Sequence, residues 1–165
     1  MLRVLFDTNI YARLAVDKNA ELIAGRLLND KEFIVYGFLP IRKELRDTPK
    51  ALMLGRLKQR NLLLTLYDRL TKSRTLSDGN DVKDLANKYY IKSKELGAKL
   101  SWIDVKVDFM MVACASINKL DIVVSEDNKM LDDGRTLDSF NMVNDQENLR
   151  VPNFWGYNRL RGKYI

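Results

Sequence analysis

Three short apolar runs constrain the fold of this 165-residue chain most strongly. They are Leu2–Phe6, Phe33–Tyr36 and Ile122–Val124, and each run leads into a glycine or a polar residue. None of them alternates strictly between apolar and polar residues, a pattern typical of strands covered on both faces, as in a parallel sheet. We consider Phe140–Val143 a further candidate strand.

The segments between these runs carry apolar residues at helical spacing. We expect helices over 19–28, from Pro40 onward, over 50–72 as two helices broken near Asn61, from the turn at 77–81 to Gly97, and over 102–119. Strands that alternate with helices predict an α/β fold, a three-layer α/β/α sandwich with a central, mainly parallel sheet. We assign residues 1–149 to this domain and predict that residues 150–165, which are aromatic and basic, form a C-terminal tail outside the core.

Histidine is absent from the chain, and Cys114 is its single cysteine. No Ser-His-Asp triad, histidine general base or zinc site built on histidine is therefore possible. Cys114 lies in an apolar run and is predicted to be a small buried hydrophobic residue. Catalytic chemistry in this chain must come mainly from carboxylates.

The chain carries a formal net charge of +6, from 28 Lys and Arg against 22 Asp and Glu. This balance is compatible with a solvated lysine-rich surface or with a polyanionic partner. No apolar run is long enough to cross a bilayer, and the amino end has no signal-peptide pattern. We therefore expect a cytoplasmic protein without membrane contact.

Four acids stand where an α/β domain places its active crevice, beyond the carboxyl ends of the strands. Asp7 and Asp127 follow predicted strands, Asp108 lies near the start of the apolar helix, and Glu44 lies on the helix after the second strand. A carboxylate in an apolar helix is costly unless it has a partner such as a divalent cation. An oxygen-only set of ligands suits Mg²⁺ or Mn²⁺.

Each acid also has a purely structural interpretation. Asp7 is placed to cap the helix that follows it, and Glu44 is placed to be a solvated helical charge. Asp104 shares a helix face with Asp108 and suits the helix dipole, but it competes for the place of the fourth acid. Glu126 competes for that place in the same way, so the fourth acid is Asp127, Glu126 or Asp104.

The chain resembles the PIN-domain ribonucleases over roughly residues 2–144, and within them the VapC-type toxins of toxin–antitoxin pairs. The residues that carry this resemblance are Leu5-Phe6-Asp7-Thr8-Asn9, Glu44, the acid-led helix Asp108-Phe109-Met110-Met111-Val112-Ala113-Cys114-Ala115, and Val123-Val124-Ser125-Glu126-Asp127. The motifs are short, but their order and spacing together are fairly specific.

The resemblance implies an acidic quartet of Asp7, Glu44, Asp108 and Asp127, with Thr8, Asn9 and Ser125 as polar neighbours. Asp7, Asp108 and Asp127 would hold Mg²⁺ or Mn²⁺ for the hydrolysis of RNA phosphodiester bonds, with Glu44 binding directly or through water. The cations expected to bind RNA are Arg42, Lys43, Arg46 and Lys50, with Tyr11 or Tyr36 as stacking platforms. The resemblance further implies a homodimer and an antitoxin protein that covers the active groove.

Two features depart from the compact toxins: a longer basic stretch between Glu44 and Ser77, and the tail with Trp155. They leave open an alternative function, a catalytically inactive PIN-like module that binds RNA or protein. A nucleotide-binding domain is disfavoured because neither G-x-G-x-x-G nor G-x-x-x-x-G-K-[ST] occurs. A receiver domain would need its acids in a different order.

Overall fold

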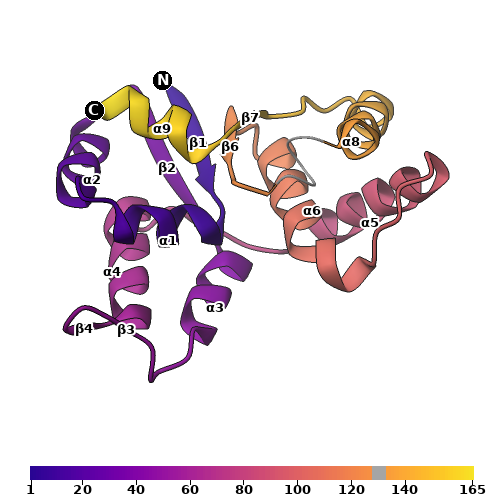
Figure 1. Ribbon diagram of the computed structural model, residues 1–165. Coiled ribbons are helices and arrows are strands. Elements are labelled where there is room, and N and C mark those ends of the chain that lie inside the picture. Colours follow the sequence, from indigo (N-terminus) through magenta and orange to yellow (C-terminus); the bar gives the residue numbers. More distant parts are fainter. Residues whose placement is uncertain (128–132) are drawn as a thin grey trace.

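The computed structural model describes residues 1–127 and 133–165. At its centre is a five-stranded sheet in the order β5-β2-β1-β6-β7, and every pairing in it is parallel (Figure 1). Its strands are β1 (Leu2–Phe6), β2 (Phe33–Phe38), β5 (Thr75–Leu76), β6 (Ile122–Val124) and β7 (Asn153–Trp155). All three apolar runs are strands of this sheet, as predicted.

Helices lie on both sides of the sheet (Figure 1). The connections from β1 through β2 to β5 contain α1 (Thr8–Val16), α2 (Ala20–Asn29), α3 (Leu39–Asp47) and α4 (Gln59–Thr71). The later connections contain α5 (Asn80–Glu95), α6 (Trp102–Ile117) and α8 (Gly134–Gln146). The chain reverses its direction across the sheet after β5, and parallel crossovers are right-handed, so the two groups cover opposite faces. This arrangement confirms the predicted α/β/α sandwich.

The reversal creates a switch point between β1 and β6. These strands pair with Val4 opposite Ile122 and Phe6 opposite Val124, so residues 7 and 125 leave the sheet side by side. In open α/β sheets, the crevice beyond the carboxyl ends of such a strand pair is the usual binding place. Asp7 and the segment from Ser125 to Asp127 therefore emerge at this crevice.

Helix α6 supplies much of the core, as its apolar sequence predicts. Its residues from Phe109 to Ser116 are buried, and Cys114 is a buried free thiol. Burial raises the pKa of that thiol to about 12, so it is protonated and unreactive at neutral pH. No helix within residues 1–127 and 133–165 combines the length and apolarity needed to cross a membrane.

Two predicted elements are wrong. Residues 140–143 belong to α8, where Phe140 and Val143 are buried and Asn141 and Met142 are exposed. That period of three suits a helix face, and four residues were too few to distinguish it from a strand. Residues 50–72 are also not two helices.

The segment from residue 50 to residue 72 contains a hairpin and one helix. Strands β3 (Met53–Leu54) and β4 (Leu57–Lys58) pair antiparallel, and α4 follows directly. Gly55 turns the hairpin with φ of +62°, a conformation that glycine adopts without steric cost. The leucine spacing of this segment is compatible with helix throughout. The structure instead forms a turn at Gly55, and the helix begins only after the hairpin.

Residues 150–165, predicted as a tail outside the core, complete the sheet. Strand β7 pairs with β6, and the last helix, α9 (Tyr157–Tyr164), packs against α2. Tyr157, Leu160 and Tyr164 are buried on its inner face. The spacing of these residues, at three and four, already identifies one apolar face of a helix.

Candidate active site

Asp7 is both the cap of α1 and a buried carboxylate at the sheet edge. Its Oδ1 accepts a hydrogen bond from the Thr8 amide at 2.6 Å, and its Oδ2 accepts from Ser125 Oγ at 2.6 Å and Asn9 Nδ2 at 2.7 Å. Only 5% of the residue is exposed. The Asp7 carboxylate thus has two roles. Its Oδ1 caps α1, and its Oδ2 is held by Ser125 and Asn9 at the crevice beyond the strand ends.

Burial raises the pKa of Asp7, and the negative charges of Glu44 and Asp127 raise it further, while the bonds from Ser125 and Thr8 act in the opposite direction. The net shift is upward. This carboxylate therefore lies in surroundings that would favour a cation.

Asp108 faces the same region from α6. Its half-buried carboxyl has a pKa raised to about 9, chiefly by burial, then by a hydrogen bond with Asp127 and by the charges of Asp7, Asp127 and Glu44. With such a pKa, Asp108 holds a proton at neutral pH. The structure thus brings the four acids of the predicted quartet within electrostatic reach of one another.

Glu44 lies at the exposed side of the crevice. Its Oε2 accepts a hydrogen bond from Thr8 Oγ1 at 2.5 Å, which ties α3 to the first residue of α1. Thr8 is therefore a neighbour of Glu44, while Asn9 and Ser125 are neighbours of Asp7. The resemblance named these three polar residues together, and the structure divides them between two acids.

The two competing acids lie differently. Asp104 is exposed in the first turn of α6, where it suits the helix dipole. Glu126 points its carboxylate at the start of α9, and its Oε1 accepts from the Tyr157 amide at 2.5 Å. Asp127 instead interacts with Asp108. Of the three candidates for the fourth acid, Asp127 is thus the one that interacts with Asp108.

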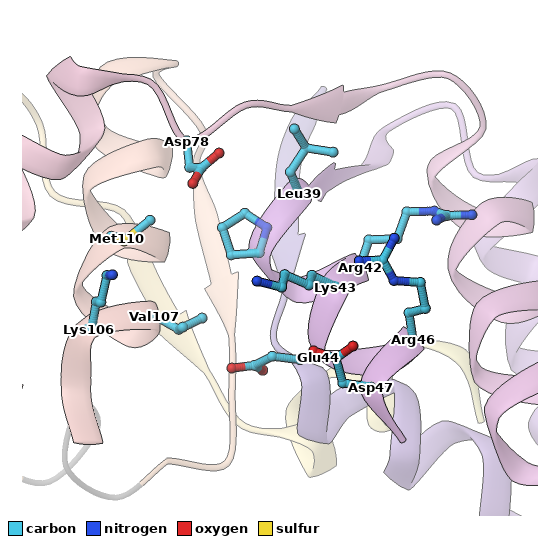
Figure 2. A pocket seen from close by; sticks show the side chains of 11 residues that line it. Leu39, Arg42, Lys43, Glu44, Arg46, Asp47, Asp78, Lys106, Val107 and Met110 are labelled. Atoms are coloured by element: carbon cyan, nitrogen blue, oxygen red, sulfur yellow. The ribbon is translucent and has the colours of Figure 1, made fainter. Parts of the chain in front are cut away.

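A groove of about 500 Å³ runs beside the crevice between α3 and α6. Figure 2 shows Lys43 and Glu44 projecting from α3 toward α6, which contributes Lys106, Val107 and Met110 to the other wall. Lys106 was not predicted as part of the site. No sequence signal pointed to it, because residues two apart on a helix, such as Lys106 and Asp108, do not share a face.

The four predicted RNA-binding cations differ in their surroundings. Lys43 and Arg46 line the groove, and Lys50 is exposed near the β3–β4 hairpin. Arg42 also lines the groove, but its guanidinium forms a two-pronged ion pair with Asp68 at 3.0 Å. That pairing engages two of the three guanidinium nitrogens and neutralises the charge that would attract a phosphate.

Neither predicted stacking tyrosine is an open platform. Tyr11 is fully buried against Tyr67, and Tyr36 is half-buried with the Arg74 guanidinium over its ring. Tyr11 cannot meet a base, because its ring has no exposed face. The helical spacing of Tyr11 with Ile10 and Leu14 already marked it as a core residue.

Oxygen donors are present in the right chemical class for Mg²⁺ or Mn²⁺. Among ion pairs between described residues, none includes Asp7, Glu44 or Asp108. Within that same part of the chain, no three acidic side chains converge tightly enough to form a ready-made metal site. The donors therefore suit a hard cation, because they are carboxylate oxygens whose negative charges a cation would neutralise. In the described residues they do not yet converge on one coordination point.

By sequence, the chain matches no family model and no curated protein. Its fold is similar to several solved structures. A chain of VapBC2 from Rickettsia felis, bound to a promoter DNA fragment, is 10% identical with a TM-score of 0.57, over 94% of this chain and 98% of that one.

Two further solved structures are similar to a comparable degree. FitAB bound to an IR36 DNA fragment is 19% identical with a TM-score of 0.57, over 93% of this chain and 94% of that one. FitAcB from Neisseria gonorrhoeae is 19% identical with a TM-score of 0.56, over 93% and 97%. These likenesses confirm the PIN-like fold.

Proposed function

We propose that this chain is a metal-dependent endoribonuclease and the toxin of a toxin–antitoxin pair. The observation that carries the proposal is the set of four acids near the β1–β6 switch point, in which burial and the other three acids raise the pKa of Asp108 to about 9. Acids that repel one another at a sheet edge reduce stability unless a ligand uses them. The similar structures, VapBC2 and FitAB, support the choice of protein class.

Asp7, Asp108 and Asp127 would hold Mg²⁺ or Mn²⁺, and Glu44 would bind directly or through water. When bound, such a metal lowers the pKa of a water ligand and neutralises charge on a phosphate. Because Asp108 carries a proton at neutral pH in the metal-free protein, it must release that proton to become a ligand. Metal binding should therefore strengthen as the pH rises toward 9.

The protein's own groups orient these acids. Ser125 and Asn9 donate to the Oδ2 of Asp7, and the Thr8 amide donates to its Oδ1, so the carboxylate is held in one orientation. Thr8 Oγ1 holds Glu44 at the rim of the crevice. Side chains fixed in this way lose little entropy when a ligand binds.

The groove beside Glu44 would bind the RNA chain. Lys43 and Arg46 from α3 and Lys106 from α6 supply positive charge next to the acids, and Lys50 extends it toward the hairpin. Residues 48–67 contain no acid and four cations, Lys50, Arg56, Lys58 and Arg60. Such a stretch favours a polyanion that would otherwise be repelled by the carboxylates.

We infer an antitoxin partner from the same likeness, because VapBC2 and FitAB are named as complexes. A gene for a small DNA-binding protein beside the gene of this chain is the expected companion. A homodimer and a cytoplasmic location complete the proposal. Light scattering of the purified chain tests the homodimer, and co-purification with the neighbouring gene product tests the antitoxin complex.

The decisive test is cleavage of end-labelled RNA with Mn²⁺, Mg²⁺ or EDTA. Wild-type protein should cleave with either metal and not with EDTA, and Asp7→Asn and Asp108→Asn should each lose at least about 100-fold in rate. Asp104→Asn is the matched control, since it changes an exposed acid on the same helix and should keep full activity. Cleavage that persists in EDTA or in both variants would refute the proposal.

One observation favours the second candidate, a non-catalytic module that binds RNA or protein. Among residues 1–127 and 133–165 the acids do not form a ready-made metal group. This candidate predicts salt-sensitive RNA binding that Lys43→Ala weakens, with no cleavage under any metal. The same RNA assay therefore separates the two functions.

A further inference from the structure

We propose that Glu126 is a positioning residue that ties the C-terminal helix to the site and thereby orients Asp127. The inference rests on the proposed metal-dependent function and assigns a role to an acid that does not face the other four. It also gives residues 153–164 a part in the site, although they contribute no acid to it.

The loop that carries Asp127 is anchored at each backbone amide from residue 125 to residue 127. The Ser125 amide donates to the Trp155 carbonyl at 2.9 Å, and the Glu126 amide donates to Asn9 Oδ1 at 3.1 Å. The Asp127 amide donates to Ser125 Oγ at 3.0 Å, and that hydroxyl donates to Asp7. Asp127 is thus linked to Asp7 through one serine.

The side chain of Glu126 connects this loop to α9. Its Oε1 accepts from the amide of Tyr157, the first residue of α9. Gly156 precedes that helix and offers no side-chain cap, so Glu126 serves as the cap from a distant part of the sequence. A carboxylate at a helix amino end is also favoured by the helix dipole.

Helix α9 is a firm support for this anchor, because two aspartates hold it along its length. Tyr157 Oη and Arg161 Nε both donate to Asp17 Oδ2, at 2.8 and 2.9 Å. Tyr164 Oη donates to Asp30 Oδ2 at 2.8 Å. A loop tied to such a helix keeps its position better than one tied to another loop.

Loss of the Glu126 carboxylate would leave the Tyr157 amide without its cap and free the loop on its α9 side. Asp127 would then sample more positions relative to Asp108 and Asp7. Partners that orient a ligand without binding the metal commonly change metal affinity or activity by about 10- to 100-fold.

The test uses the full-length chain with the variants Glu126→Ala and Glu126→Gln. The control is Glu147→Ala, which removes a different surface carboxylate, one that pairs with Lys88. Mn²⁺ affinity is measured by calorimetry without RNA, and kcat and KM are measured with RNA. Glu126→Ala should weaken Mn²⁺ binding and lower kcat by about 10-fold, with KM nearly unchanged. Glu126→Gln should stay within about twofold of wild type, since its amide oxygen still accepts from Tyr157.

Three outcomes would overturn the inference. Equal losses in Glu126→Gln and Glu126→Ala would make Glu126 a metal ligand. Wild-type Mn²⁺ affinity in Glu126→Ala would deny it any role at the site. A lowered melting temperature with unchanged Mn²⁺ affinity would make its role purely structural.

The inference can also be judged if the chain proves to bind no metal and cleave no RNA, which would refute the proposed function alone. The Asp127 amide hydrogen, which is bonded to Ser125 Oγ, should exchange with solvent faster in Glu126→Ala than in Glu126→Gln or Glu147→Ala, after correction for the effect of sequence on intrinsic exchange. Unchanged exchange at Asp127 in Glu126→Ala would overturn the positioning role independently of any activity.

Discussion

Aspartates in two regions of this molecule have opposite electrostatic surroundings. Beneath α9, each of two aspartates has one basic partner and one tyrosine hydroxyl that donates to it. Asp17 pairs with Arg161 and Tyr157, and Asp30 pairs with Lys163 and Tyr164. At the switch point, Asp7 and Asp108 are largely buried near other carboxylates, and the donors that bond to Asp7 are neutral.

The pKa shifts follow these surroundings. The Asn19 amide, Tyr157 and Arg161 lower the pKa of Asp17. Burial alone would raise the pKa of Asp30, but bonds from Tyr164 and Lys163 outweigh it and lower the pKa. Asp7 and Asp108 shift upward. An aspartate that is paired with a basic side chain of the same protein stabilises the fold. An aspartate surrounded by other acids reduces stability and indicates a place where a ligand binds.

The largest expected effect is stabilisation by Mn²⁺. At about 100 times its dissociation constant, a ligand that binds only the folded state adds about 2.7 kcal/mol, or roughly 5–10 °C in melting temperature for a chain of this size. Asp7→Asn should abolish this shift and Asp30→Asn should preserve it. Differential scanning calorimetry with and without Mn²⁺ measures both, and an equal shift in Asp7→Asn would remove the distinction between the two regions.

Without metal, neutral substitutions in the two regions should change stability in opposite directions. Asp108 must take up a proton when the chain folds at pH 7, so Asp108→Asn removes that cost and should raise the free energy of unfolding by about 1–3 kcal/mol. Asp30→Asn removes a charged acceptor and should lower it by about 1–3 kcal/mol. Urea unfolding in EDTA at pH 7 gives both values. Destabilisation by both variants would show that Asp108 is also a structural acid.

The pH dependence of stability should separate the regions again. The folded-state pKa of Asp108, about 9, lies above its ordinary 3.8, so the folded protein holds a proton that the unfolded chain has lost between these values. Stability in EDTA should therefore fall as pH rises through this range, by at most about 1.4 kcal/mol per pH unit.

Asp17 and Asp30 have lowered pKa values, so their contribution is present above pH 3.8 and is lost as pH falls below it. Asp108→Asn should flatten the decline above pH 4, and Asp30→Asn should flatten the acid limb below it. Melting temperatures between pH 3 and pH 9 test both. A neutral-to-alkaline profile that Asp108→Asn leaves unchanged would contradict the raised pKa.

The smallest effect is expected from Tyr164→Phe, which removes one hydroxyl that donates to Asp30. It should cost about 1 kcal/mol, since Lys163 continues to neutralise the aspartate. RNA cleavage should be unchanged, because Tyr164 lies at the far end of α9 from Glu126. Chemical unfolding combined with the RNA assay checks both statements, and a loss of activity would extend the site further along α9 than we propose.

Much of the fold could be predicted from local patterns in the chain. Strands such as Leu2–Phe6 are apolar enough to be buried on both faces, and α6 is apolar nearly all round. The errors arose where a pattern was too short or ambiguous. Residues 140–143 suit a strand or a helix equally, and the leucines of residues 50–72 conceal the turn at Gly55.

The candidate site was predictable in part for a similar reason. Acids that follow strands must emerge at the sheet edge, so Asp7 and Asp127 could be identified from position alone. The choice between Asp127 and Glu126 could not be made this way, because the two are adjacent in sequence. The pairing of Arg42 with Asp68 likewise depends on a segment distant in the chain.

By itself, the sequence determined which chemistry is possible: without histidine, and with acids at strand ends, only oxygen donors are available in quantity. It also determined the three inner strands β1, β2 and β6 and several helices, since hydrophobic periodicity is local. The tertiary structure alone decided how the acids differ. Parallel pairing of β1 with β6 sets Asp7 beside Ser125, and the return of residues 153–164 turns Glu126 toward α9. Carboxylates of one chemical type acquire separate roles because desolvation, neighbouring charge and hydrogen bonding are properties of three-dimensional surroundings.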